Sequence, residues 1–196
     1  MSAEISANGD WPFGKLKMFG YGLIMADPPW DFRTYSQEGQ KKGPASHYNV
    51  MSIAEIKALP IRHLAAGDCI LWLWATHPML PQQIEVCAAW GFRFVSSGVW
   101  IKRTINGKLN FGTGYRLRYA SEPFLIATNG NSDTANNVRT VIEGPIREHS
   151  RKPDEAFAAA AHRVGGVPKL ELFSRQSPEG WDTWGNQATK FDEAAA

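Results

Sequence analysis

The stretch YGLIMADPPW, residues 21–30, passes from an apolar run directly into an acid, two prolines and a tryptophan. The apolar run has the length and composition of a buried β-strand. The prolines stiffen the chain after it, because each fixes its own φ and Pro29 restricts Pro28 to an extended conformation. The proline carbonyls and the Asp27 carboxylate accept hydrogen bonds, and Trp30 adds a flat face. By itself the tetrapeptide is either a stiff turn with a core tryptophan or a slot for the exocyclic amine of a planar base.

Further strands and helices alternate along the chain. Short apolar runs predict strands at 21–26, 69–76, 92–101, 121–128, 138–142 and 169–173. Capping, proline and periodicity signals predict helices after Ser52, after Pro78 and from Pro153. A loop and a short helical piece near Asn186 follow the last strand. The alternation favours an α/β sheet with helices on both faces, and such sheets place ligands beyond the carboxyl ends of their strands.

The domain organisation is expected to be simple. A length of 196 residues suits one domain, so we expect a single domain over residues 1–196. Within it we expect a loose lead-in at 1–20 and a disordered tail at 191–196. The polar segments 31–50 and 103–116 lack any period, and long loops of this kind are more often functional than accidental. We therefore assign both loops to the substrate side.

Composition excludes several classes of protein. No apolar run reaches the roughly 18 residues of a membrane span, and no basic-then-apolar signal opens the chain. Cys69 and Cys87 lie far apart in apolar segments. They support neither a zinc site nor a disulfide framework, and they fit a reducing cytoplasm. The net charge is +2, but basic residues are grouped, as at Lys102 with Arg103. They are either scattered surface charge or, if they converge on one groove, a site for a polyanion.

The order of the segments resembles one enzyme family. The tetrapeptide DPPW after YGLIMA is similar to motif IV of amino-methyltransferases, and its Trp form resembles the MT-A70 family of S-adenosylmethionine-dependent adenine-N6 methyltransferases. The resemblance continues in order over residues 21–190 through SHYNVMS, LWLWAT, AAWGFRFVSSGVWIK, GTGYRLRYASEPFLIAT, SRKPDEAF, KLELFSR and WGNQ. It implies a Rossmann-like methyltransferase sheet with a permuted motif order, in which the catalytic DPPW precedes the cofactor-binding segments.

The resemblance also implies roles for residues on the substrate side. Asp27 and the Pro28 carbonyl hold the N6 amine of adenine, and Pro29 completes the stiff catalytic segment. Trp30 stacks on the base or walls its pocket. The residues implied in substrate binding are Tyr48, Trp100, Lys102 and Glu122.

The implied cofactor is S-adenosylmethionine. Lys152 is expected to pair with the carboxylate of the cofactor, since a cation at a helix start is otherwise unfavourable beside the helix dipole. The other residues implied in cofactor binding are Asp27, Phe13, Phe173, Arg175, Asn186 and Gln187. The segment after Arg175 is shorter than in eukaryotic members of the family and lacks their His-Asn pair.

The implied reaction is direct in-line methyl transfer to N6 of adenine in DNA, by a catalyst that needs no covalent intermediate. A compact form without an added RNA-binding module resembles phage and bacterial DNA adenine enzymes. Two alternatives stay open, an RNA adenosine methyltransferase and a non-catalytic, nucleic-acid-binding partner subunit. The intact tetrapeptide counts against the latter. The small net charge suggests that a homodimer or a partner subunit pools the basic surface.

Overall fold

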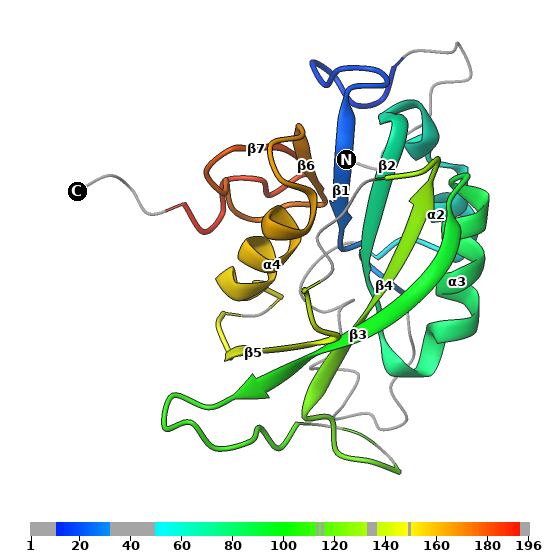
Figure 1. Cartoon of the computed structure of the whole chain (residues 1–196). Helices are drawn as coiled ribbons and strands as arrows, with labels where there is room; N and C mark the ends of the chain where they lie inside the picture. Colours follow the sequence, from blue (N-terminus) through cyan, green and yellow to red (C-terminus); the bar gives the residue numbers. More distant parts are fainter. Residues whose placement is uncertain are drawn as a thin grey trace.

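The computed structural model describes residues 11–31, 50–112, 114, 116–132, 137–148 and 150–192. Its strands are β1 (Tyr21–Ala26), β2 (Ala65–Trp74), β3 (Arg93–Arg103), β4 (Ser121–Asn129), β5 (Val141–Pro145), β6 (Lys169–Leu172) and β7 (Trp181–Trp184). Its helices are α2 (Ile53–Ala58), α3 (Leu80–Ala89) and α4 (Asp154–Val164), with short 3-10 turns η2 (Ile61–His63) and η3 (His77–Met79). The strands join one sheet in the order β5-β3-β4-β2-β1-β6-β7 (Figure 1).

The sheet is mixed, because β4 runs against its neighbours. β1 pairs in parallel with β2 and β6, β6 pairs in parallel with β7, and β3 pairs in parallel with β5. β4 is antiparallel to both β2 and β3. The amino end of β4 therefore lies at the same edge as the carboxyl ends of β1, β2 and β6. In open α/β sheets this edge is where ligands bind.

Two apolar cores cover the two faces of the sheet. Ile24 and Ala26 of β1 pack into the core that α2 and α3 close, whereas Leu23 and Met25 pack into the core that α4 closes. A strand that is buried on both faces has a continuous apolar sequence, as β1 does. Figure 1 shows α4 on one side of the sheet and α2 with α3 on the other. The predicted α/β sheet with helices on both faces is confirmed.

Local sequence signals explain the helix ends. At the start of α2 the Ser52 Oγ accepts from the Glu55 N–H at 3.2 Å, and the Ser52 N–H donates to the Glu55 carboxylate at 2.7 Å, which completes the predicted capping box. After α3 the chain turns at Gly91 with a φ of 79°. Pro153 precedes the first turn of α4 as predicted. No helix in the described ranges is long and apolar enough to cross a lipid bilayer.

Several strand predictions need correction. β2 begins four residues earlier than predicted, and β5 occupies Val141–Pro145 rather than 138–142. β7 lies where we expected a loop, and residues 186–191 form turns instead of a short helical piece. β7 has four residues and pairs with β6, so the neighbouring strand supplies the hydrogen bonds that define it. The local pattern of four residues is too short to predict a strand.

The two ends of the described chain are less loose than expected. Phe13 in the lead-in is 1% exposed and packs in the core. The Phe191 N–H donates to the Arg175 carbonyl at 2.8 Å, and the Ser177 N–H donates to the Asp192 carboxylate at 2.7 Å. The first two residues of the expected disordered tail are therefore tied to the loop after β6.

Candidate active site

The DPPW segment leaves the carboxyl end of β1 at the ligand-binding edge. The Asp27 N–H donates to a β6 carbonyl at 3.3 Å, which continues the pairing of the two strands by one residue. The Trp30 N–H donates to the Pro28 carbonyl at 2.8 Å, and the Met51 N–H donates to the Pro29 carbonyl at 2.9 Å. Each carbonyl has two lone pairs, so both proline oxygens keep the capacity to accept from a ligand.

Trp30 lies in the core below the site. Its side chain is 3% exposed, and its Nε1 donates to the Trp74 carbonyl at 3.1 Å. The indole thereby joins the ends of β1 and β2. We expected this ring to stack on a base or to wall its pocket, but in this structure it offers no open stacking face. Trp30 is therefore a core tryptophan. Any slot for the amine of a base is formed by Asp27 and the prolines without it.

A chain of ion pairs extends from Asp27 across the edge. The Lys152 Nζ lies 2.8 Å from Asp27 Oδ2 and 2.7 Å from Glu122 Oε1, and the Lys102 Nζ lies 2.7 Å from Glu122 Oε2. Glu122 reaches the cluster because β4 runs antiparallel and presents its amino end at this edge. Lys152 is 6% exposed and also lies 5.2 Å from the Trp74 ring centroid. Two ammonium groups balance two carboxylates, so the cluster is close to neutral.

The cluster shifts the pKa of its members. Burial raises the pKa of Asp27, and Glu122 adds to this, while Lys152 opposes it. Burial acts in the same direction on Glu122, but Lys152 and Lys102 outweigh it and lower the pKa of Glu122 to about 2. Burial tends to lower the pKa of Lys152, yet Asp27 and Glu122 hold it above its usual value. Glu122 and Lys152 are therefore ionised at neutral pH, and Asp27 is a more basic carboxylate than usual.

Trp100 supports this cluster from below. It is 2% exposed, its Nε1 donates to the Gly144 carbonyl at 3.1 Å, and the Lys102 Nζ lies 4.8 Å from its ring centroid. We expected Trp100 in substrate binding, but the core encloses it. Its ring lies against the Lys102 ammonium instead, and cation–π attraction stabilises this contact.

A second buried acid, Glu171 of β6, lies on the cofactor side of Asp27. Both acids line a small pocket together with Lys152. The Ser174 Oγ lies 2.5 Å from the Glu171 Oε2 and also contacts the Gln176 carbonyl. The Ser174 hydroxyl has one proton, so it donates to one of these two acceptors at a time. Burial raises the pKa of Glu171 to about 7, and the charge of Asp27 adds to the effect, while the Ser174 hydrogen bond and Lys152 oppose it.

Glu171 should make the protein less stable as the pH rises. A carboxyl whose pKa is raised in the folded state binds more protons than the unfolded chain between its ordinary pKa and about 7. We expect stability to fall across that window by up to about 3 kcal/mol. Urea denaturation of wild type and Glu171→Gln at several pH values measures this, and the variant should lose most of the slope. The same slope in the variant would remove Glu171 as its source, and Glu85→Gln, on an exposed acid, is the matched control.

Three aromatic rings form a cluster that reaches the pocket through Phe173. The Phe13 and Trp184 ring centroids are 5.1 Å apart, and those of Trp184 and Phe173 are 5.5 Å apart, both edge to face. Phe173 also lines the pocket with Asp27, and its φ of 61° turns the chain out of β6. Phe13 and Phe173, both predicted on the cofactor side, are thus joined through Trp184.

Polar residues from the loops before and after β7 lie near this pocket. Arg175 lines the same pocket as Asp27, and its charge lowers the pKa of that acid. Asn186 is exposed, whereas the Gln187 Oε1 is buried and has no hydrogen-bond partner among the described residues. A Cβ at Gly185 would lie 2.9 Å from the Ser174 backbone nitrogen, so the two loops approach too closely for a side chain there. This close approach brings the Asn-Gln pair next to the end of β6.

The structure therefore brings most of the predicted site together. Asp27, Glu122 and Lys152 are in direct contact, with Lys102 beside them. Tyr48 lies outside the described residues. Sequence reasoning missed Glu171 and Ser174, although an acid inside the apolar strand KLELF was a visible signal.

The fold and this edge define a Rossmann-like methyltransferase, with a mixed sheet whose first strand delivers Asp-Pro-Pro-Trp to the ligand site. The MT-A70 family model matches residues 21–187, and the chain belongs to the MT-A70 family. The permuted order of the motifs agrees, since DPPW precedes the segments at Lys152 and Gln187.

Relatives of different length match this chain. The chain is 29% identical to the type II methyltransferase M.MunI of Mycoplasma sp, over 90% of this chain and 81% of that protein. It is 32% identical to an N(6)-adenosine-methyltransferase MT-A70-like protein of Arabidopsis thaliana, over 85% of this chain and 24% of that protein. It is 30% identical to the N(6)-adenosine-methyltransferase subunit METTL3 of Danio rerio, over 85% of this chain and 28% of that protein. The chain thus spans about a quarter of the adenosine-methyltransferase relatives and most of M.MunI.

MT-A70 methyltransferases use S-adenosylmethionine as methyl donor. The residues present suit this group. The buried Gln187 Oε1 has no hydrogen-bond partner among the described residues and can accept from an amine, and Phe173 lines the pocket. Arg175 and Lys152 are cations near the same pocket and suit the cofactor's carboxylate.

Proposed function

We propose that this protein transfers the methyl group of S-adenosylmethionine to the N6 amine of adenine in DNA. The observation that carries the proposal is the position of Asp27, which lines the pocket at the carboxyl end of β1 and is followed directly by the stiff Pro28-Pro29 segment. An exocyclic amine has two N–H groups, and the Asp27 carboxylate and the Pro28 carbonyl are two acceptors that match them. Asp27 Oδ2 already accepts from Lys152 at 2.8 Å. A carboxylate offers about four lone-pair sites, so Asp27 retains the capacity to bind the amine.

The same two acceptors assist the reaction. The N6 lone pair is delocalised into the adenine ring, and hydrogen bonds from the amine to Asp27 and Pro28 localise it on nitrogen as positive charge develops. When bound, S-adenosylmethionine supplies an electrophilic methyl group on its sulfonium. The nitrogen–carbon bond forms as the sulfur–carbon bond breaks, and N6 then loses a proton. Because the pKa of Asp27 is raised, its carboxylate accepts this proton more readily than an ordinary aspartate.

Lys152 has two roles in this proposal. Its ammonium has three N–H donors, of which two point to Asp27 and Glu122 at 2.8 and 2.7 Å. These contacts fix the Asp27 carboxylate in position. The third donor is assigned to the carboxylate of the cofactor, as the family resemblance implies. Lys152 thus couples cofactor binding to the orientation of Asp27.

DNA is the favoured polymer because of how the chain compares with its relatives. It spans 81% of M.MunI, a type II methyltransferase, but 24% of the Arabidopsis adenosine methyltransferase. The chain thus matches the compact type of relative more fully than the longer type. In a duplex the N6 amine is engaged in pairing, so the target base must be flipped out at a cost of a few kcal/mol.

Comparison of three polymers tests the choice of DNA. Duplex DNA, single-stranded DNA and RNA of one adenine-rich random sequence would be incubated separately with labelled cofactor, and the initial rates compared. We expect DNA to be methylated at least about tenfold faster than RNA, a preference that contacts to the sugar can supply. Faster transfer to RNA would overturn the choice of DNA and leave the adenine reaction intact. An absence of transfer to all three polymers would overturn the proposed function.

A further inference from the structure

The chain leaves β3 through a tight hairpin that projects beyond the sheet. The Gly107 N–H donates to the Thr104 carbonyl and the Thr104 N–H donates to the Lys108 carbonyl, both at 2.8 Å. Gly107 has a φ of 74°, so residues 105–107 form the common three-residue hairpin loop that ends in a left-handed glycine. The segment 103–116, which we expected to be an open loop, therefore begins with a built and compact tip.

Large apolar side chains are exposed to solvent in the hairpin and in the chain that follows it, up to Leu117. Ile105 at the tip is 94% exposed, Leu117 is 77% exposed and Phe111 is 75% exposed. In the described part of the chain they are the most exposed large apolar residues. Each forgoes roughly 1.5–3 kcal/mol that burial could provide. Apolar side chains gathered in this way mark a surface for interaction.

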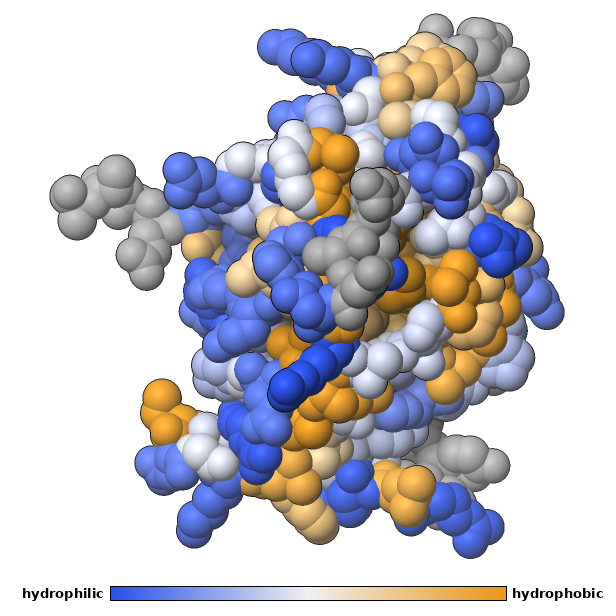
Figure 2. Space-filling view, in the orientation of Figure 1, coloured by the Kyte–Doolittle hydropathy of each residue, from blue (hydrophilic) through white to orange (hydrophobic). Residues whose placement is uncertain are grey.

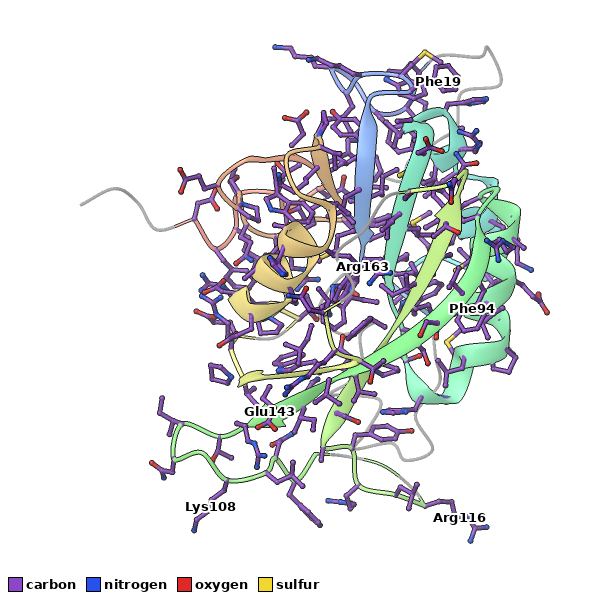
Figure 3. All side chains as sticks on the ribbon, viewed as in Figure 1. Phe19, Phe94, Lys108, Arg116, Glu143 and Arg163 are labelled. Carbon is purple, nitrogen blue, oxygen red and sulfur yellow. The ribbon has the colours of Figure 1, made fainter. Side chains whose placement is uncertain are left out.

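The segment that contains these side chains is basic. Residues 101–120 contain no Asp or Glu, and their basic residues are Lys102, Arg103, Lys108, Arg116 and Arg118. Figure 3 shows Lys108 and Arg116 at the end of the molecule that lies farthest from β1, and Figure 2 shows apolar and hydrophilic residues interleaved there. The Arg118 guanidinium lies 4.7 Å from the Phe111 ring centroid. Glu122 and Glu143 from neighbouring strands pair with Lys102 and Arg103, and the region keeps a net positive charge. Net positive charge favours a polyanion over a protein partner.

The hairpin is connected directly to the active site. Lys102 is the second-to-last residue of β3, just before the hairpin. It pairs with Glu122 at 2.7 Å, and Glu122 pairs with Lys152 beside Asp27. Ile105 follows Lys102 by three residues, a span of about 10 Å along an extended chain. The tip therefore projects from the strand that carries the Lys102–Glu122 pair, at the same edge of the sheet as Asp27.

We infer that this hairpin is a wedge for duplex nucleic acid. Ile105, with Phe111 and Leu117 behind it, inserts into the stack beside the target adenine, and the basic side chains bind the adjacent phosphates. The apolar side chains fill the space that the flipped base vacates and offset the few kcal/mol of unstacking. The inference rests on the proposed function and adds to it a duplex substrate and the device that opens it.

The test compares one sequence in two forms. Methyl transfer by wild type, Ile105→Ala and Leu117→Ala would be measured on a DNA duplex and on its separated strand. We expect each variant to lose at least about tenfold in rate on the duplex and less than about twofold on the single strand, because a single strand has little stacking to break. Ile84→Ala, at an exposed isoleucine on α3, is the matched control and should change neither rate.

A second readout separates this inference from the proposed function. Wild type should raise the fluorescence of a duplex that carries 2-aminopurine in place of adenine, because unstacking brightens this base, and Ile105→Ala should lose most of the rise. This signal needs no methyl transfer. Unchanged fluorescence and duplex rates in the variants would overturn the wedge, as would equal losses on both forms of DNA or a wild type that acts on single strands alone. Loss of a concentration-dependent dimer in the variants, with both rates falling together, would instead assign the hairpin to a protein interface.

Discussion

Asp27→Ala is expected to abolish methyl transfer while the protein stays folded. The substitution removes the acceptor that localises the N6 lone pair and the nearest group for the departing proton. Loss of one such preorganised group costs about 100- to 1,000-fold in rate, and loss of both functions should reach or exceed the upper end. Asp27→Asn keeps the shape and one acceptor oxygen, so it should be impaired but less severely. Single-turnover transfer measures both variants against wild type.

The controls for this prediction test folding and charge. When Asp27 is removed, Glu122 keeps its 2.7 Å contacts with Lys152 and Lys102, so the cluster retains two ion pairs and circular dichroism should show a native fold. Glu85→Ala removes an exposed acid that pairs with Lys57, and its transfer rate should match that of wild type. An Asp27→Ala protein that keeps more than about a tenth of the wild-type rate would exclude Asp27 as a preorganised catalytic group.

Lys152→Met is expected to have the largest effect on stability. The lysine is 6% exposed and bridges two carboxylates, and its removal leaves Asp27 without its ion-pair partner and Glu122 with Lys102 alone. Breaking a buried ion pair by deleting one partner costs about 3–5 kcal/mol. The loss should be greater at pH 8 than at pH 5, because the pKa of both carboxyls rises when Lys152 is removed and protonation relieves the excess negative charge at low pH. Urea denaturation at both pH values measures this.

Two further variants make the Lys152 prediction specific. Lys102→Met removes a cation whose side chain is 26% exposed and that makes one of the pairs to Glu122, so it should cost about 1 kcal/mol or less. In Lys152→Met with Glu122→Gln, the negative charge of Glu122 next to the unpaired Asp27 is gone, and part of the stability should return. A Lys152→Met protein as stable as wild type, with no pH dependence of the difference, would contradict the buried bridge.

The role of Lys152 in cofactor binding can be measured on the same variant at a pH where it is folded. We expect affinity for S-adenosylmethionine to fall at least about tenfold, since a charge-assisted hydrogen bond is lost. Affinity for nucleic acid should change little. Calorimetry that shows unchanged cofactor affinity would leave Lys152 with its positioning role alone.

Local sequence signals predicted the parts of the fold that depend on neighbouring residues. The apolar run before Asp27, the capping box at Ser52 and the proline before α4 each act within one turn or strand, and each lies where predicted. β7 was missed because its hydrogen bonds come from β6, which precedes it by about ten residues. Strand order and direction likewise depend on the whole sheet, so no local pattern indicated that β4 is antiparallel.

The direction of β4 also explains what could be predicted of the site. Glu122 is at the amino end of β4, whereas the general rule for α/β sheets places ligands at the carboxyl ends of strands. Only the family resemblance therefore indicated a role for Glu122. Lys152 was expected to face the cofactor alone, because its contacts with Asp27 and Glu122 are created by packing between distant segments. The burial of Trp30 and Trp100 is of the same kind, since exposure of a tryptophan is decided by the elements that pack around it.

The identity of the methylated atom is the decisive measurement for methyl transfer to adenine N6. DNA would be incubated with wild type and a cofactor that carries a deuterated methyl group, then digested to nucleosides and analysed by mass spectrometry against synthetic standards, with Asp27→Ala as the blank. We expect all of the label in N6-methyladenine and none in the blank. Label in another base, or at another nitrogen of adenine, would contradict methyl transfer to N6.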